Sequence, residues 1–308
     1  MKNLLFLILF SPLICFTQTT GKSGKDISVS PMIEGTILVP ETDKKPALAI
    51  LIGGSGPTDR NGNQSMMKNN SLRFLAEGLY ENGIAVFRYD KRILKQLKEK
   101  TLTEEAIRFD DFIKDAKDVI AFFKRSNAFS KIYVIGHSQG SLVGMIAAQN
   151  GIDGFISIAG AGQEIDDVIV DQIAIQSPGL KDNARTSFDD MRANGIAVRY
   201  SQGLASIFRP QIQPFMISWM KYNPQTEIAK LQIPVLIING EKDLQVQVPE
   251  AEKLKEAYPE AQYEIIPLMN HIFKQIEGDD IDNSKSYNNP SMPVMPELIA
   301  IISNFIKK

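Results

Sequence analysis

The sequence predicts an α/β protein with a mostly parallel central sheet and helices on both of its faces. Short apolar runs such as ALAILIGG (47–54) and KIYVIG (131–136) alternate with longer segments of helical spacing. This alternation is typical of parallel strands joined by helices. The 308 residues are 44% apolar, enough for one large core, and their formal charge is only −2. No excess of positive charge therefore points to nucleic acid or anionic lipid as a partner.

The expected elements follow one another regularly up to residue 160. Asn82-Gly83 is a typical helix stop. One later segment has apolar residues at 112, 113, 116, 119, 120, 122 and 123, which is helical spacing. In chain order we expect a strand pair at 27–39, strand 47–54, helix 71–81, strand 84–90, helix 110–126, strand 131–136, helix 141–149 and strand 154–160.

The alternation then breaks over residues 163–229, which contain helix-like stretches and no clear strand. It resumes with strand 234–240, helix 249–257, strand 263–268 and helix 296–308. We therefore expect one domain over 18–308, with 163–229 as a helical lid inserted near one edge of the sheet.

The first seventeen residues have the pattern of a signal peptide: one lysine, an apolar stretch from Leu4 to Phe10, and Pro12. A membrane-spanning helix needs about 20 apolar residues, so we expect cleavage near Thr17–Gln18. The product would be periplasmic or secreted, without stable membrane association. A lipoprotein reading of Cys15 is disfavoured because Ile14 precedes it, and a buried N-terminal helix is a further alternative.

Cys15 is the only cysteine. A chain cleaved after it has no disulfide, no thiol nucleophile and no cysteine-based zinc site. We expect neither a metal nor a cofactor.

Gly136-His137-Ser138-Gln139-Gly140 matches the pattern G-x-S-x-G. The pattern alone is weak evidence, but here an expected strand precedes it and an expected helix follows it. A turn this sharp strains the serine backbone and needs glycines on either side. It would project the Ser138 hydroxyl above the sheet at a helix N-terminus. An incidental serine in a glycine turn is the alternative.

A serine hydroxyl needs a base, and the base needs a group that orients it. Of the two histidines, His137 adjoins Ser138 and should point away from its Oγ. His271, just beyond strand 263–268, is thus the candidate base, although a loop histidine bonded to a carbonyl is the alternative. Asp243 follows strand 234–240 and is the candidate acid, although it could be a turn residue.

Glu241 and the Asp279–Asp280 pair are weaker candidates for the acid. The order serine, aspartate, histidine is that of α/β-hydrolases.

The stretch ILIGGSGPTDRNGN (50–63) places four glycines directly after a strand. It lacks the Gly-Lys-Ser/Thr of a phosphate loop and the third glycine of a dinucleotide-binding loop. Residues 59–63 imitate a calcium loop, but Gln64 and Asn70 stand where such a loop needs glycine and glutamate. We therefore expect an oxyanion hole, formed by the backbone N–H groups of Ser55 and Gln139.

At these residues the sequence resembles bacterial carboxylesterases of the α/β-hydrolase superfamily with a G-S-G-P-x-D-R-D-G-type loop. The resemblance rests on 54–62, Tyr89-Asp90-Lys91-Arg92, 136–140, Asp243, His271 and the tail SYNNPSMPVMPELI (286–299). It implies a serine esterase acting on small or medium acyl esters.

Two departures from the family pattern stand out. Asn61 occupies a position where aspartate is usual. Ile93-Leu94-Lys95-Gln96 replaces a glycine-rich turn, and we expect that loop to shape a different pocket.

The insertion suggests where a substrate would lie. Phe208, Phe215, Met216, Trp219, Met220 and Tyr222 would either line an acyl pocket or pack the lid onto the core. Glu164, Asp166 and Asp167 would either bind a substrate ammonium, as in an aminopeptidase, or form a solvated helix start.

The leading hypothesis is a serine carboxylic-ester hydrolase working through an acyl-enzyme on a small-molecule ester. A peptidase, an aminopeptidase or a thioesterase would use the same three residues. A non-catalytic binding protein on a hydrolase scaffold is the alternative from another class.

Overall fold

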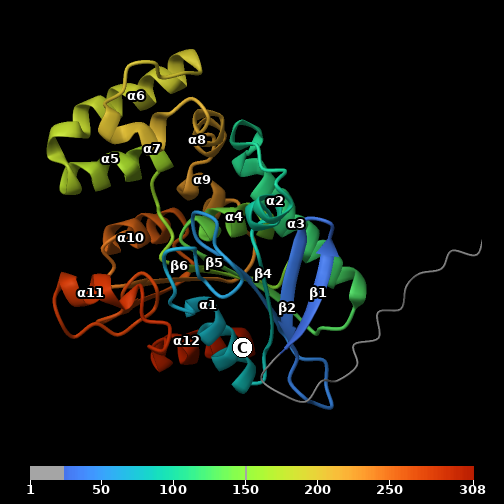
Figure 1. Cartoon of the computed structure of the whole chain (residues 1–308). Coiled ribbons are helices and arrows are strands. Elements are labelled where there is room, and N and C mark those ends of the chain that lie inside the picture. The colour runs from blue at the N-terminus through green and yellow to red at the C-terminus, as the bar shows by residue number, and fades with distance from the viewer. Residues whose placement is uncertain (1–23, 150) are drawn as a thin grey trace, which may run out of the picture.

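The computed structural model describes residues 24–149 and 151–308 (Figure 1). The predicted signal peptide lies outside these residues. One eight-stranded sheet has the order β1-β2-β4-β3-β5-β6-β7-β8. β1 pairs with β2, and β2 with β4, in antiparallel fashion, and the other neighbours are parallel. The strands are β1 (Lys25–Ser30), β2 (Ile33–Leu38), β3 (Leu48–Ile52), β4 (Ala85–Tyr89), β5 (Ile132–His137), β6 (Gly154–Ile158), β7 (Val235–Gly240) and β8 (Gln262–Ile266).

Helices connect the parallel strands. They are α1 (Ser71–Glu81), α2 (Arg92–Glu99), α3 (Phe109–Ser126), α4 (Gln139–Ala148), α5 (Ile165–Gln176), α6 (Lys181–Asn194), α7 (Ala205–Phe208), α8 (Gln213–Trp219), α9 (Pro224–Ala229), α10 (Val248–Ala257), α11 (Asp280–Ser286) and α12 (Pro296–Lys307). Short 3₁₀ turns lie at Glu104–Ala106, Pro178–Leu180 and Gln202–Leu204.

The sheet separates two apolar cores. Leu48, Ile50 and Ile52 of β3 pack in the core under α3, α4 and α10, whereas Ala49 and Leu51 pack in the core under α1 and α12. Figure 1 shows these helix layers on opposite faces of the sheet. A parallel strand buried on both faces needs apolar residues at every position, which explains the unbroken run LAILI.

Most of the expected elements are confirmed, and two helices were missed. Residues 93–96, expected as a loop, lie within α2, because leucine, lysine and glutamine favour helix. Helix α11 was also not foreseen, although Asp279 caps it by accepting the N–H groups of Ile281 and Asp282.

The segment 163–229, all of which is described, contains α5 to α9 and no strand. It has an apolar core of its own, in which Phe188, Phe208, Met191 and Met216 are buried. Figure 1 shows α5 to α8 as a group beside the body of the molecule. Within 24–149 and 151–308, no helix is both long and apolar enough to cross a membrane.

Candidate active site

Ser138 occupies a sharp turn between β5 and α4. Its φ is 54° and its ψ is −122°, a backbone conformation that non-glycine residues rarely adopt. A Cβ on Gly136 would lie 2.3 Å from the carbonyl oxygen of Gly140, and one on Gly140 would lie 2.3 Å from that of Ile52. Both glycines of the motif are therefore required by close backbone contacts.

Ser138 is half-buried and lines a cavity of about 360 Å³ together with His271 and the glycine-rich loop. The cavity opens at the carboxyl ends of parallel strands, where α/β sheets usually bind their ligands. β3 leads into the loop, β5 into Ser138, β7 into Asp243 and β8 into His271. Four segments far apart in sequence thus meet at one edge of the sheet.

Asp243 and His271 are in direct contact. The Nδ1 atom of His271 lies 2.7 Å from Oδ2 of Asp243, and both residues are buried. The other carboxylate oxygen, Oδ1, accepts the backbone N–H groups of Gln245 and Val246 at 2.8 and 2.9 Å. Because a carboxylate accepts, Nδ1 of His271 carries the proton, which leaves Nε2 as the free basic nitrogen.

His137 contributes in a way that the sequence did not reveal. Its Nε2 donates to the backbone carbonyl of His271 at 2.8 Å, and the two imidazole rings lie 4.8 Å apart. Its ring also meets Phe273 edge-on at 4.7 Å. Burial, with the nearby charges of His271 and Lys91, holds the pKa of His137 well below its usual value. A neutral His137 therefore supports the His271 loop.

The glycine-rich loop approaches the serine closely. A Cβ on Gly54 would lie 3.3 Å from Cβ of Ser138 and 3.4 Å from Nδ1 of His137. The carbonyl of Ser55 accepts from Oγ1 of Thr58 at 2.8 Å and from Nε2 of Gln64 at 2.9 Å. These bonds fix the peptide that follows Ser55.

Neither predicted oxyanion donor is otherwise engaged. In the described part of the chain, the backbone N–H groups of Ser55 and Gln139 donate no hydrogen bond. Ser55 lines the cavity, and Gln139 directly follows Ser138 at the start of α4. Both N–H groups are therefore available to bind a negative oxygen.

The calcium-like part of the loop is held by its own side chains. Oδ1 of Asp59 accepts the backbone N–H groups of Asn61 and Asn63 at 2.8 Å. Arg60 pairs with Asp90 at 2.6 Å and Asp26 at 3.0 Å. The described residues contain no cluster of three or more histidine, cysteine or acidic side chains placed to hold a metal ion.

A buried lysine also stands close to the turn. Nζ of Lys91 donates to Oε1 of Gln139 at 2.6 Å and lies 4.8 Å from the ring centre of Phe112. Burial lowers the pKa of Lys91 to about 7. The sequence showed Lys91 only as part of a family-like stretch, and nothing local indicated its partner.

The lid aromatics do not line the cavity beside Ser138. Phe208 is buried inside the insertion. Trp219 stacks on Phe109 at 5.2 Å, and Phe215 meets Phe112 at 5.9 Å. The structure thus favours the packing interpretation, because these rings bind the insertion to α3.

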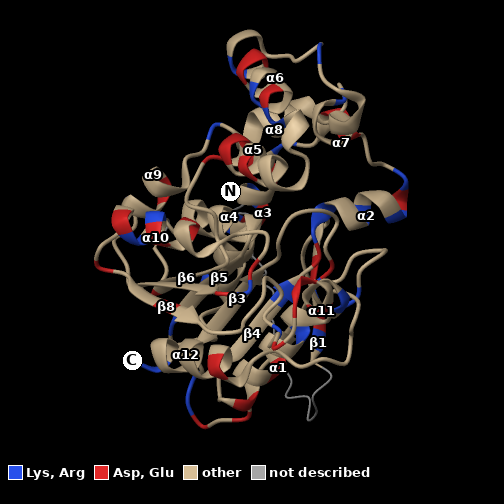
Figure 2. Cartoon of the chain, turned by 90° about the vertical axis from the view of Figure 1, so that its left-hand side faces the viewer, with Lys and Arg blue, Asp and Glu red and all other residues tan. Residues whose placement is uncertain are grey.

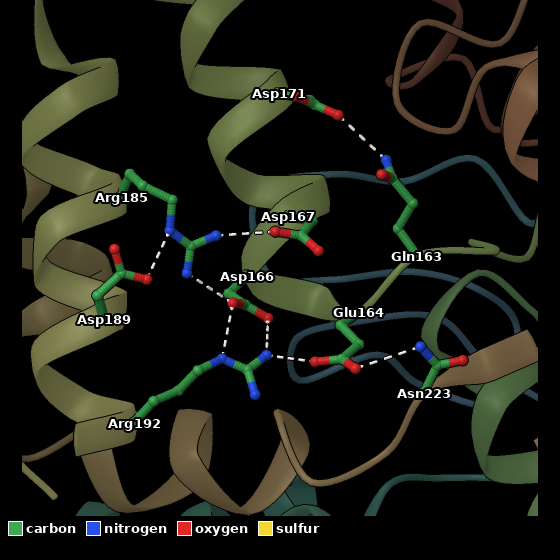
Figure 3. A network of polar contacts seen from close by, with 9 residues as sticks. All are labelled: Gln163, Glu164, Asp166, Asp167, Asp171, Arg185, Asp189, Arg192 and Asn223. Carbon is green, nitrogen blue, oxygen red and sulfur yellow. Dashed lines mark hydrogen bonds and ion pairs between the residues drawn. The ribbon is translucent and has the colours of Figure 1, made fainter. Parts of the chain in front are cut away.

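The acidic cluster of the insertion is paired with arginines, as Figure 3 shows. Asp166 binds Arg185 at 2.7 Å and Arg192 at 2.6 Å, and Arg192 also binds Glu164. Asp167 binds Arg185 at 2.8 Å. None of the three acids lines the cavity, so they form a network within the insertion. Figure 2 shows acidic residues on α5 and both acidic and basic residues on α6.

The three weaker candidates for the acid form no hydrogen bond with His271 in the described part of the chain. Asp279 caps α11, and the described contacts of His271 include neither Glu241 nor Asp280. Gln245 and Tyr287, which sequence reasoning missed, line the cavity and bind each other at 2.9 Å.

The chain is similar to known proteins in sequence and in fold. The family model for serine aminopeptidase S33 matches residues 68–184, less than half of the chain, including Ser138. Esterase EstD of Thermotoga maritima is 28% identical over 270 residues, which are 82% of this chain and 61% of that protein. The chain thus spans about three fifths of the length of this curated relative.

Among solved structures, Est1E of Butyrivibrio proteoclasticus aligns with a TM-score of 0.60 at 18% identity, over 93% of this chain and 100% of Est1E. A dienelactone hydrolase of Anabaena variabilis aligns at 0.51 and 14% identity, over 92% and 95% of the two chains. The esterase relative and the matched family model support a hydrolytic enzyme. The chain has the α/β-hydrolase fold.

Proposed function

We propose that this protein is a serine carboxylic-ester hydrolase that acts on small to medium acyl esters. One observation carries the proposal: Ser138, at a strained turn, shares a cavity with His271, whose Nδ1 is bound to the buried Asp243. The likeness to an esterase supports the same reaction class.

The proposed reaction has two halves. In the first, Oγ of Ser138 attacks the ester carbonyl while Nε2 of His271 takes the serine proton. The N–H groups of Ser55 and Gln139 bind the oxyanion of the tetrahedral intermediate. The C–O bond to the leaving group breaks, His271 returns the proton to the departing alcohol, and an acyl-Ser138 ester remains.

In the second half, water attacks the acyl-enzyme and gives its proton to His271. The intermediate collapses, the carboxylic acid leaves, and His271 returns the proton to Oγ of Ser138. Asp243 stays ionised throughout and stabilises the imidazolium by its bond to Nδ1. No metal or cofactor enters these steps.

The cavity gives an expectation for the substrate. Its volume of about 360 Å³ lies at the lower end of the range for small-molecule sites. Hydroxyl and amide side chains predominate on its wall, and Met67 and Ile272 are apolar exceptions. We therefore expect short acyl chains to be preferred over long ones.

The match to the serine aminopeptidase model favours peptides as a second candidate. An aminopeptidase must bind a substrate ammonium, but Glu164, Asp166 and Asp167 are already paired with arginines. A thioesterase would use the same proton transfers, so only a substrate assay separates it from the ester hydrolase.

The test uses a fluorophosphonate probe and p-nitrophenyl esters from acetate to octanoate. The wild type should be labelled and should hydrolyse short esters fastest. Ser138→Ala should no longer be labelled, and its kcat should fall by about 10⁶-fold. Asp243→Asn should lower kcat by about 10⁴-fold. Ser206→Ala, at an exposed serine, is the matched control and should behave as wild type.

Other outcomes would redirect the proposal. Labelling without ester turnover would leave the nucleophile in place and move the substrate to aminoacyl anilides or thioesters. A wild type that is never labelled would show that the site is not assembled for catalysis, and a binding protein would take its place.

Export belongs to the same proposal and is supported by the pattern of residues 1–17. Mass spectrometry of protein from fractionated cells should find a mature N-terminus near Thr17–Gln18 outside the cytoplasm. An uncleaved chain in the cytoplasmic fraction would contradict it.

A further inference from the structure

Lys91 is an amine buried where the proposed mechanism has no direct use for it. It follows the carboxyl end of β4, and only 8% of its surface is exposed. Among the described residues it forms no ion pair with a carboxylate. Burying an ammonium without a counter-ion is costly, so the position of Lys91 calls for an explanation.

The amine contacts Gln139 at the serine turn and Phe112 on α3. Nζ donates to Oε1 of Gln139 at 2.6 Å and sits over the ring of Phe112 at 4.8 Å. Burial lowers the pKa of this amine to about 7, in keeping with a dry environment. A hydrogen bond is stronger in such surroundings than in water.

The hydrogen bond from Lys91 bears on the proposed reaction through Gln139. Its side chain is buried at 5% exposure, and its backbone N–H is one of the two proposed oxyanion donors. It is also the first residue of α4, where the backbone leaves the strained conformation of Ser138. Oxyanion donors act by being held in place before charge develops.

We propose that Lys91 is a positioning residue, which anchors the Gln139 side chain and thereby fixes the Ser138–Gln139 peptide for oxyanion binding. This inference rests on the proposed ester hydrolysis. It assigns Lys91 no contact with the substrate, because Lys91 does not line the cavity beside Ser138.

Three variants test the inference: Lys91→Met, Gln139→Met and the double variant. Methionine is similar in length to both side chains, and Gln139→Met keeps the backbone N–H. Each single variant should lower kcat by about 10- to 100-fold, less than removing an oxyanion donor outright, with KM nearly unchanged. The rate of fluorophosphonate labelling should fall in parallel, since the probe also places an oxygen in the oxyanion hole.

The double variant separates positioning from independent effects. If Lys91 acts through the Gln139 side chain, the double variant should be no slower than the slower single variant, because the second change removes nothing more. A product of the two losses would overturn the inference, as would wild-type kcat in Lys91→Met. Lys98→Met, at an exposed lysine on α2, is the control and should retain wild-type kcat.

The inference can still be tested if one of the variants does not fold. If Lys91→Met does not fold, Gln139→Met tests the same hydrogen bond from its other end, and wild-type kcat there would overturn the proposal. Failure of the proposed function looks different, because the wild type itself would then hydrolyse none of the esters, whether or not the probe labels it.

Discussion

At the scale of single residues, the glycine-rich loop is defined by how closely its backbone approaches the serine. Gly54 has no side chain, so its Cα can sit against Cβ of Ser138 and the ring of His137. The absence of a Cβ here serves the geometry of the site, since no positive φ requires glycine at Gly54.

Gly54→Ala should therefore reduce activity more than stability. Its Cβ would lie 3.3 Å from that of Ser138, so the serine must shift by a few tenths of an ångström, and we expect kcat to fall roughly 10- to 100-fold. Gly179→Ala is the control, because a Cβ there meets nothing within 4 Å. Equal kcat values for the two variants would contradict this account.

Arg88 is a buried arginine whose side-chain partner is a neutral amide. It is 7% exposed, and its Nη1 donates to Oδ1 of the neutral Asn61 at 2.6 Å. Its Nε has no hydrogen-bond partner in the described part of the chain. Burial lowers the pKa of Arg88, which means that burying the charged guanidinium costs free energy of folding.

Asn61→Asp should therefore stabilise the protein. A carboxylate at this position would give Arg88 a charge-assisted hydrogen bond in place of a neutral one, a gain of about 1 kcal/mol in the free energy of unfolding. Asn61→Ala should lower that free energy by about 1–3 kcal/mol, because Nη1 of Arg88 loses its acceptor. Chemical denaturation of both variants is the measurement, and an Asn61→Asp variant less stable than wild type would refute the interpretation.

At the scale of secondary-structure elements, α5 and α6 are joined by charge as well as by apolar packing. Asp166 on α5 is 1% exposed and binds Arg185 and Arg192 of α6. Burial alone would raise the pKa of Asp166, but the hydrogen bonds from Arg192 and Arg185 outweigh it and lower the pKa. The network thus stabilises the helix pair only while Asp166 is ionised.

The sign of the pH effect follows from that lowered pKa. The stabilisation is complete above the ordinary aspartate pKa of about 4 and is lost as the pH falls through the lower folded value. Asp166→Asn should reduce the free energy of unfolding by about 1–3 kcal/mol at pH 7, because two arginines lose a buried partner.

The difference between wild type and Asp166→Asn should shrink as the pH falls below 4, which denaturant titrations and hydrogen exchange in α5 and α6 would follow. Asp189→Asn is the matched control, because this 62% exposed carboxylate should contribute under about 0.5 kcal/mol. A difference that is constant with pH would exclude an electrostatic role for Asp166.

At the scale of the whole molecule, the insertion and the site are connected less directly than the sequence suggested. The insertion contacts α3 through Trp219 on Phe109 and through Oγ of Ser218, which accepts the N–H of Phe109 at 2.7 Å. No residue of 163–229 lines the cavity beside Ser138. The insertion packs beside the site, and the cavity wall comes from the body.

Trp219→Leu should therefore loosen the insertion without disabling the site. Loss of the stacked ring should cost about 1–3 kcal/mol of stability and speed proteolytic cleavage within 163–229. Hydrolysis of acetate esters should stay within about threefold of wild type, because lining residues are untouched. Loss of acetate activity in a folded variant would show that the insertion holds the site together.

The sequence alone determined the features that depend on local backbone chemistry. Alternating strands and helices predicted the parallel sheet, and the spacing of Gly136, Ser138 and Gly140 predicted the strained turn, because such a turn tolerates only glycine at its close contacts. Asp243 and His271 were predicted as well, because both follow parallel strands whose carboxyl ends share one edge.

Only the tertiary structure decided which distant residues pair with one another. Lys91 meets Gln139 across 48 residues, and His137 meets the carbonyl of His271 across 134. The aromatics of 208–222 could have lined a pocket, and Asp166 could have bound a substrate, until their partners on α3 and α6 were known. A side chain's role in such cases is set by what lies opposite it in space, and that depends on packing between elements that no local pattern encodes.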